Sequence, residues 1–226
     1  MNRRNDISPS SYARWRASAL GAITERLEHD LILSMLPPIN GKRVLDVGCG
    51  DGALTGKIAE RGAEVIGADA NPDMIAAAKQ RAAGTYQVAD AAALPFADNT
   101  LDAVTAVTVL CVCDDPETLI QEMVRVLKPG GHLVIGELGR WSLWALVRCL
   151  RGLVGNRMWR ETHFFTIAEL MALTAGAGLK VQASRGAVYY PPLGVAAQMI
   201  SPMDATLSRA CGQVGAAFIA LSAKKI

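Results

Sequence analysis

The chain has 226 residues, of which 51% are hydrophobic and 19% are charged, so it can bury a core and is not a disordered protein. Its 23 basic and 21 acidic residues leave a formal charge of +2, which gives no reason to expect nucleic acid as a partner. Five cysteines, an odd number without zinc-ligand spacing, argue against a disulfide framework and against a metal site. We therefore expect a cytoplasmic protein with a small-molecule partner.

The sequence predicts no segment that inserts into a membrane. Residues 1–16 are polar and lack the apolar stretch of a secretory signal. The apolar run that begins at Trp141 is interrupted by Arg148 and Arg151 and is shorter than the roughly 20 residues that span a bilayer. We expect neither export by this route nor a membrane-spanning helix.

Helical and strand-like periods alternate along the chain. Apolar residues at helical spacing predict a helix over residues 19–36, which stops at Pro37 and Pro38. Short apolar strands and helices then follow one another: strands over 43–48, 64–69, 85–90, 101–112 and 132–138, and helices over 53–62, 71–84 and 115–131. A helix over 166–178 and strand-like runs over 180–190 and 215–225 complete the pattern.

This alternation predicts an α/β fold with a Rossmann-like, doubly wound, mostly parallel sheet whose ligand lies beyond the carboxyl ends of the strands. We expect one domain over residues 1–226. Its parts are a helical N-terminal cap (1–40), a binding core (41–140), a lid after the fifth strand with the sixth-strand region (141–214) and a last strand (215–226).

A glycine-rich loop follows the first strand. Gly48, Gly50 and Gly52 allow a tight turn and close approach of the backbone to a ligand at a helix N-terminus. The same loop also satisfies the dinucleotide pattern G-x-G-x-x-G/A, so an NAD-dependent dehydrogenase remains an alternative. Asp46 and Asp51 bracket the glycines, however, and these acids favour a cationic ligand over a pyrophosphate.

Two further acids end the next strands. Asp69 ends the second strand, where a carboxylate can accept hydrogen bonds from both hydroxyls of a ribose. Asp90 ends the third, where it can accept from an adenine amino group while the backbone of Ala91 meets the ring. Acids at three successive strand ends indicate an adenosine that bears a positively charged amino-acid tail.

The segments VLDVGCGDG, GADANPDMI, ADAAALPFADNTLDAV and LKPGGHLVIGEL, in this order between about residues 41 and 137, resemble the motifs of class I S-adenosylmethionine-dependent methyltransferases. They are most similar to the small-molecule group that includes ubiquinone and menaquinone methyltransferases. The resemblance implies about seven strands with the last antiparallel, S-adenosylmethionine as cofactor, and in-line transfer of its methyl group to a small, apolar or aromatic acceptor.

The resemblance also implies a role for each cofactor residue. Gly48, Gly50 and Gly52 would line the methionine moiety, whose ammonium group Asp46 and the carbonyl of Val107 would contact. The other expected cofactor residues are Asp69 at the ribose with Ala70 beside it, Asp90, Ala91 and Met74 at the adenine, and Tyr12 near the tail.

The sequence gives fewer indications of the residues that contact the methyl acceptor than of those that bind the cofactor. Where many relatives have two histidines, this chain has Leu110, Cys111, Val112 and Cys113, so a histidine base of the family type is not expected there. We take residues 141–165 as the cover of the acceptor pocket. Trp141, His163 and Tyr189 are the expected substrate residues, and the candidate catalytic residues are Glu137, His163 and Tyr190. Tyr189 and Tyr190 should end the sixth strand and point in opposite directions.

One helix within this cover has two distinct faces. Trp141, Trp144, Arg148 and Arg151 form an aromatic and basic stripe, and Leu143, Leu146, Leu150 and Leu153 lie opposite to it. An ordinary surface helix explains this pattern, and weak contact with a membrane surface is the second interpretation. A non-catalytic S-adenosylmethionine-binding protein also remains an alternative, and the chain is expected to be a monomer or a homodimer.

Overall fold

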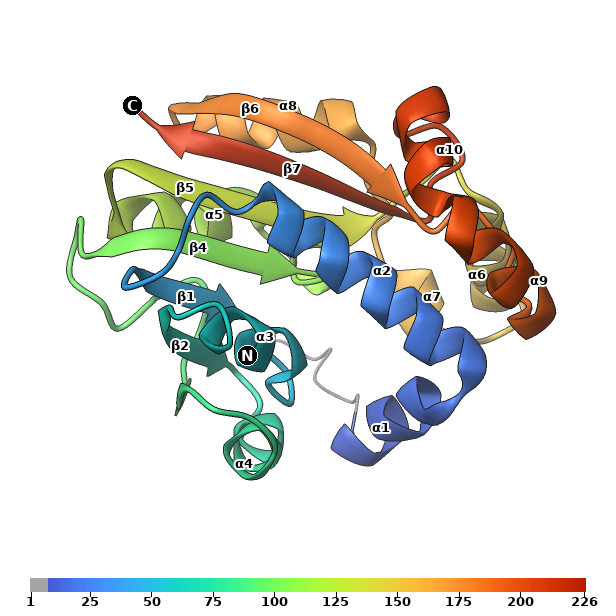
Figure 1. Ribbon diagram of the computed structural model, residues 1–226, viewed down its shortest axis with the longest axis horizontal. Helices are drawn as coiled ribbons and strands as arrows, with labels where there is room; N and C mark the ends of the chain where they lie inside the picture. Colours follow the sequence, from blue (N-terminus) through green and yellow to red (C-terminus); the bar gives the residue numbers. More distant parts are fainter. Residues whose placement is uncertain (1–7) are drawn as a thin grey trace.

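Seven strands form one twisted sheet in the computed structural model, which describes residues 8–226 (Figure 1). The strand order is β3-β2-β1-β4-β5-β7-β6, in which β1 to β5 are parallel and β7 runs antiparallel to β5 and β6. The strands are β1 (Arg43–Val47), β2 (Glu64–Asp69), β3 (Thr85–Val88), β4 (Leu101–Val107), β5 (Leu127–Leu138), β6 (Leu179–Ala187) and β7 (Phe218–Lys225). The predicted fold class and the antiparallel last strand are confirmed.

Ten α-helices and two 3₁₀ turns are found among residues 8–226. Proline in the first turn and a side-chain cap begin α1, α4 and α5, where Ser8, Asn71 and Asp115 accept from backbone N–H groups. The helices are α1 (Pro9–Ala17), α2 (Ala19–Met35), α3 (Ala53–Ala59), α4 (Pro72–Arg81), α5 (Pro116–Val126), α6 (Leu143–Leu153), α7 (Arg157–Glu161), α8 (Ile167–Gly176), α9 (Gly194–Ile200) and α10 (Asp204–Cys211), with 3₁₀ turns η1 (Leu110–Val112) and η2 (Ser201–Met203). The first seven residues of the predicted cap lie outside the described part of the chain.

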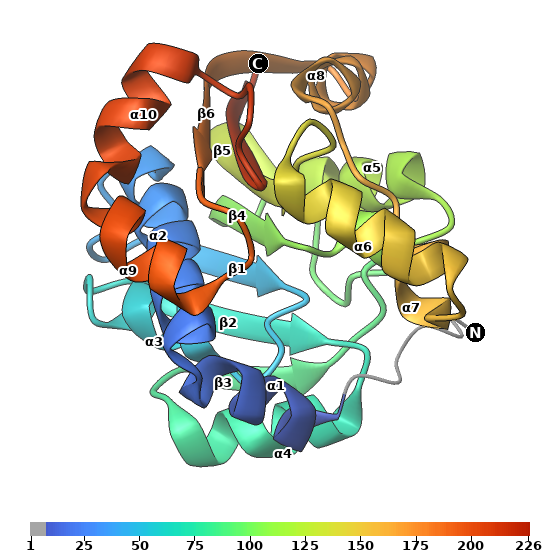
Figure 2. The same cartoon turned by 90° about the vertical axis from the view of Figure 1, so that its right-hand side faces the viewer.

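Helices cover both faces of the sheet. On one side α2 and α3 pack their apolar residues against Val44, Val134 and Phe218, and on the other α5 and α8 pack against the opposite side chains of the same strands, such as Leu45 and Ile135. Figure 2 shows α2, α9 and α10 to the left of the sheet and α5 and α8 to its right. Burial on both faces explains why the strands are continuously apolar instead of alternating with polar residues.

The structure differs from the sequence-based expectation in four places. The predicted helix over 115–131 ends at Val126, and residues 127–131 already belong to β5. The predicted strand over 101–112 ends at Val107 and is followed by η1, because Thr108 turns the backbone to a φ of 54°. The sixth strand ends at Ala187, so Tyr189 and Tyr190 lie beyond it. The stretch around residues 191–214, for which the sequence predicted no helix, forms α9, η2 and α10. No helix among residues 8–226 has the length and apolar character that crossing a membrane requires.

The turn after β4 is held by a carboxylate from the neighbouring strand. Glu137, near the carboxyl end of β5, is fully buried. Its Oε1 accepts from the backbone N–H groups of Val109 and Leu110 at 3.1 and 2.7 Å, and its Oε2 accepts from that of Cys111 at 3.3 Å. Burial raises the pKa of Glu137 to about 7.

The loop after β3 is anchored in a comparable way by α5. The Glu122 carboxylate accepts from the backbone N–H of Leu94 at 2.9 Å, and the Arg125 guanidinium donates to the carbonyls of Leu94 and Phe96 at 2.9 and 2.8 Å. Arg125 also forms an ion pair with Asp98 at 2.6 Å. These contacts fix the loop that carries Asp90 and Ala91 to the carboxyl edge of the sheet.

We predict that Glu137→Gln lowers the free energy of unfolding by about 1–3 kcal/mol, measured by urea denaturation at pH 8. The amide retains one oxygen acceptor, but its NH₂ group meets a backbone N–H that then has no partner. At pH 8 the wild-type carboxyl is ionised, so the comparison is between a carboxylate and an amide.

The matched control is Glu60→Gln, because Glu60 is exposed at the end of α3. The control should lie within about 0.5 kcal/mol of wild type. Equal stabilities of Glu137→Gln and Glu60→Gln would contradict the assigned role of Glu137.

Candidate functional site

The glycine loop leaves open space at the carboxyl end of β1. Gly48 and Gly50 have φ values of 66° and 53°, which side chains rarely adopt. A Cβ on Gly48 would lie 2.3 Å from Cγ2 of Val109, whereas a Cβ on Gly50 would meet nothing within 4 Å. The loop therefore packs closely against the turn after β4 on one side and can receive a ligand at Gly50.

Asp46 lies behind this loop instead of on its surface. It is 2% exposed, and its two oxygens accept from the hydroxyls of Thr55 and Thr105 at 2.6 and 2.8 Å. Burial raises the pKa of Asp46 to about 6. The direct ammonium contact expected for Asp46 has little room in this structure, and its observed contacts support the loop from below.

Asp69 connects the end of β2 to the glycine loop. Its carboxylate is half-buried and accepts from the backbone N–H groups of Gly50 at 2.9 Å and of Asn71 at 2.8 Å. A carboxylate has about four lone-pair positions, so Asp69 can still accept from ligand hydroxyls. Ala70 follows it and is exposed.

The expected adenine residues lie next along the same edge. Asp90 is exposed two positions beyond β3, and its Oδ1 accepts from the backbone N–H of Ala92 at 2.9 Å. Ala91 is half-buried, and Met74 is buried in the first turn of α4. Because β2 and β3 are parallel neighbours, these residues and Asp69 meet at adjacent strand ends.

The N-terminal helix α1 reaches the glycine loop through an arginine that the sequence pattern did not single out. Arg16 is buried and pairs through Nη2 with Asp51 at 2.5 Å, and its Nε lies 3.2 Å from Oε1 of Glu25. Its guanidinium also lies over the ring of Tyr12, 4.8 Å from the centroid. Arg81 of α4 pairs with the same Asp51 at 3.1 Å. The cap and the glycine loop thus share one ion-pair network.

Arg16 supplies a test of whether the site suits S-adenosylmethionine. Its Nη1 is buried and has no hydrogen-bond partner within residues 8–226. The methionine tail of this cofactor ends in a carboxylate, which a free guanidinium N–H can bind. The carbonyl of Val107 accepts from the Thr108 hydroxyl at 2.8 Å and keeps a second lone pair for the tail's ammonium group. These groups and Asp69 fit the cofactor.

The expected acceptor residues line a separate cleft of about 840 Å³ beside α6. Trp141, His163, Tyr189 and Tyr190 all contribute to its wall, but none of the expected cofactor residues does. Trp141 is 70% exposed. His163 is exposed, and its Nε2 lies 3.3 Å from Oε1 of Glu169, so a surface carboxylate already engages it. Whether this cleft receives the acceptor stays a prediction.

Two candidate catalytic residues make structural contacts. Tyr190 is 1% exposed, its hydroxyl lies 2.9 Å from that of Thr24 in α2, and burial raises its pKa to about 12. Glu137 is fully buried and already accepts three backbone N–H groups. Tyr189 donates its hydroxyl to the carbonyl of Gly212. Glu137 and Tyr190 are therefore buried and hydrogen-bonded in this structure, and a catalytic role for either of them stays a prediction.

The structure shows which face of α6 is buried. Trp144 is buried and Arg148 is half-buried, whereas Leu143, Leu146, Leu150 and Leu153 are more than half exposed. The helical period was predicted correctly, but an ordinary surface helix would have buried the leucines. Among residues 8–226, no group of three or more His, Cys, Asp and Glu side chains is placed to hold a metal ion.

Comparison with known proteins identifies related sequences. A family model described as a methyltransferase domain matches residues 45–135. The ubiquinone biosynthesis O-methyltransferase of Cereibacter sphaeroides is 35% identical over 185 residues, which are 76% of this chain and 74% of that protein. An uncharacterized protein of Mycobacterium tuberculosis is 35% identical over 181 residues, 79% of this chain and 59% of that protein. This chain therefore spans less than two thirds of the length of the mycobacterial relative.

Solved structures share the fold over nearly the whole chain. A methyltransferase from Thermotoga maritima has a TM-score of 0.73 and 23% identity and covers 96% of this chain and 95% of its own. Magnesium protoporphyrin IX methyltransferase from Synechocystis, with S-adenosylhomocysteine bound, has a TM-score of 0.73 and 15% identity and covers 99% and 98%. Sequence, fold and the residues at the carboxyl edge agree, and the chain belongs to the class I S-adenosylmethionine-dependent methyltransferases.

Proposed function

We propose that this chain transfers the methyl group of S-adenosylmethionine to a small, apolar or aromatic acceptor. The observation that carries the proposal is the pair of groups at the glycine loop: Asp69, which can accept from ribose hydroxyls, and Arg16, whose unpartnered Nη1 can donate to a carboxylate. Two relatives support a small acceptor by their names, a ubiquinone biosynthesis O-methyltransferase and the demethylmenaquinone methyltransferase of Renibacterium salmoninarum, which is 40% identical over 108 residues.

The residues of the chain act by binding, orientation and exclusion of water. The bound sulfonium supplies an already activated methyl group, so much of the rate can come from positioning. The Arg16–Asp51 ion pair holds α1 over the glycine loop and keeps solvent from that side. With Glu137 and Tyr190 buried and satisfied, the proposal assigns no general base to either of them.

Two alternatives lead to different outcomes. An NAD-dependent dehydrogenase would bind a pyrophosphate at the glycine loop, but Asp51 and Asp69 place carboxylates there. A non-catalytic S-adenosylmethionine-binding protein would bind the cofactor at the same residues without turnover. The free thiols of Cys149 and Cys211, both exposed, are consistent with a reducing compartment such as the cytoplasm.

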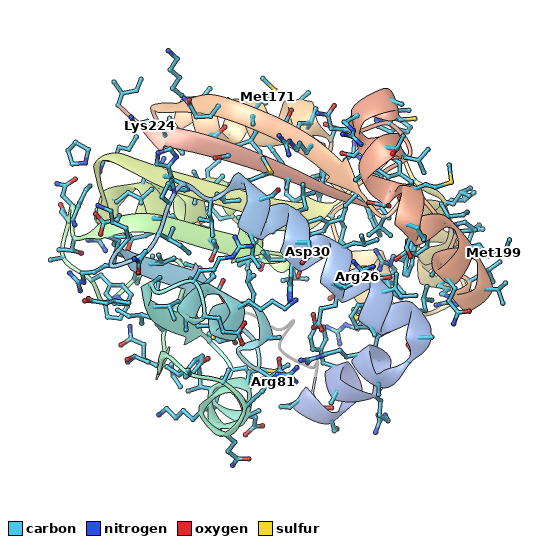
Figure 3. The ribbon with its side chains drawn as sticks, in the orientation of Figure 1. Arg26, Asp30, Arg81, Met171, Met199 and Lys224 are labelled. Carbon is cyan, nitrogen blue, oxygen red and sulfur yellow. The ribbon has the colours of Figure 1, made fainter. Side chains whose placement is uncertain are left out.

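We also propose that the exposed apolar face of α6 lies on an anionic membrane surface. Leu153 is 82% exposed, and Arg151 and Arg160 flank this face with exposed positive charges, as in helices that lie in the interface of a bilayer. At the same end of the molecule α9 exposes further apolar residues, and its Met199, 74% exposed, points away from the protein (Figures 1 and 3). Such contact would bring the site close to lipophilic acceptors.

We predict that S-adenosylhomocysteine binds the protein and that Asp69→Ala weakens this binding about tenfold to a hundredfold, measured by isothermal titration calorimetry. Loss of a charged hydrogen-bond acceptor costs about 1.5–3 kcal/mol. NAD should give no saturable heat.

Asp73→Ala is the matched control, because Asp73 is exposed in the neighbouring helix α4 and should leave the affinity unchanged. Saturable NAD binding without a response to S-adenosylhomocysteine would contradict the proposal. Equal affinities of the two aspartate variants would remove Asp69 from the site.

We expect turnover when the protein is incubated with methyl-labelled S-adenosylmethionine and a small-molecule extract of the cells that produce it. Mass spectrometry should find a labelled product that carries one added methyl group, and Asp69→Ala should reduce its amount. Binding of S-adenosylhomocysteine without any labelled product in repeated fractions would favour the non-catalytic alternative.

We expect the protein to sediment with vesicles of phosphatidylcholine and phosphatidylglycerol, and Leu150→Ser with Leu153→Ser to weaken this binding about tenfold or more. Met171→Ser is the control, because Met171 is 42% exposed on α8, away from α6 (Figure 3). Equal vesicle binding by both variants would contradict the proposal, as would a dimer in solution that the leucine substitutions dissociate.

A further inference from the structure

The strongest unassigned feature near the site is the guanidinium of Arg148. It lies between two indole rings, with its carbon 4.7 Å from the ring centroid of Trp144 in α6 and 4.7 Å from that of Trp159 in α7. Cation–π attraction to both rings holds it in place. Within residues 8–226 the Arg148 side chain forms neither a hydrogen bond nor an ion pair.

The N–H groups are the part of the Arg148 guanidinium that can bind a ligand. Two aromatic rings pack against the guanidinium, so its N–H groups are the part that can still contact a partner. An arginine presents these N–H groups as a fork that matches the two oxygens of a carboxylate. A half-buried fork without a partner is costly to desolvate, which favours an anionic ligand there.

The surroundings of Arg148 come from elements that border the cofactor site. Among the charged and titratable groups around Arg148, Glu28 of α2 and Cys111 of η1 have the largest electrostatic effects on its pKa. Glu28 is half-buried, its pKa is raised to about 8 by burial, and it is not within ion-pair distance of Arg148. The Arg148 guanidinium therefore lies near a carboxyl of α2 without forming an ion pair with it.

The turn after β4 connects this gap to the glycine loop. Cys111 follows Val109 by two residues, and Val109 packs against the position where Gly48 lacks a Cβ. Glu28 also acts on Tyr12 of α1, which stands beside Arg16. Arg148 therefore lies near η1, the turn that follows β4 and packs against the glycine loop through Val109.

We propose that Arg148 binds a carboxylate of the methyl acceptor, with the indoles of Trp144 and Trp159 setting the plane of the guanidinium. This inference rests on the proposed function and narrows the acceptor to an aromatic or apolar acid. It places the carboxylate of the acceptor at Arg148, which does not line the cleft of Trp141 and His163, and so differs from the expectation that this cleft receives the acceptor. The competing explanation is that Arg148 only joins α6 to α7 by packing between the two rings.

The test compares two probes by calorimetry on protein saturated with S-adenosylhomocysteine: 2-naphthoate and its neutral analogue 2-naphthamide. Wild type should bind 2-naphthoate more tightly than 2-naphthamide. Arg148→Met should weaken 2-naphthoate about tenfold or more and leave 2-naphthamide nearly unchanged, because the charged hydrogen bonds are lost while the packing volume is kept. At pH 9, above the raised pKa of about 8 of Glu28, Glu28→Gln should tighten 2-naphthoate, because a competing negative charge is removed.

Arg148→Lys keeps a positive charge beside the rings but lacks the two-pronged guanidinium, so it should lose part of the preference for 2-naphthoate over 2-naphthamide. This variant keeps the test informative if Arg148→Met folds poorly. Arg151→Met, on the exposed side of the same helix, is the matched control and should behave as wild type. Equal weakening of both probes by Arg148→Met, or no preference for 2-naphthoate in wild type, would overturn the inference. Failure of wild type to bind S-adenosylhomocysteine would instead overturn the proposed function, so the two failures are distinguishable.

Discussion

Backbone N–H groups in the turns at the carboxyl edge have no strand partner, and carboxylates from other elements accept their hydrogen bonds. Each of these turns contains a residue with positive φ: Gly50 after β1, Thr108 after β4 and Val188 after β6. The three acids are Asp69, which accepts from Gly50 and Asn71, Glu137, which accepts from Val109, Leu110 and Cys111, and Asp204, which accepts from Val188 and Tyr189. The positions of these three turns depend on this satisfaction of backbone N–H groups.

These hydrogen bonds from backbone N–H groups to carboxylates make the turns rigid and bring negatively charged side chains to the site. A carboxylate that accepts two or three N–H groups fixes the turn, but its burial disfavours the ionised form and raises the pKa of Glu137. Burial likewise raises the pKa of Asp46, which accepts from two threonine hydroxyls. The Arg16 and Arg81 guanidinium groups at Asp51 balance part of this charge from the cap and from α4. A cationic ligand beside Gly50 would favour the ionised carboxylates further, since opposite charges attract.

Sequence periodicity was sufficient for the sheet and for the order of the loops, because strands buried on both faces are continuously apolar and end at recognisable glycines and acids. Periodicity could not tell whether an acid at a strand end faces a ligand or holds a backbone turn. Asp69 and Glu137 occupy similar positions along their strands, yet Asp69 keeps free lone pairs beside the glycine loop and Glu137 is enclosed. Only the partners in space distinguish them.

The sequence pattern did not show the role of Arg16 or which face of α6 is buried. Arg16 lies in the short polar helix α1, where no apolar period indicates which side faces the protein. The two stripes of α6 both contain large apolar groups, so its period defined two faces without saying which one is buried. The packing of Trp144 against Tyr190, whose carbonyl accepts from Nε1 of Trp144 at 2.7 Å, decides that orientation in the structure.

The inward turn of Trp144 and Arg148 gives the two sides of the site opposite charge. Asp69 places a carboxylate on the glycine-loop side, where Arg16 and Arg81 already neutralise Asp51, and Arg148 places a positive charge on the α6 side. An acceptor with a carboxylate is repelled by the first side and attracted by the second. Its charged end is therefore directed toward α6, which leaves its remaining atoms to face the glycine loop, where the methyl group is supplied. Electrostatics alone can orient such an acceptor, without a base that also binds it.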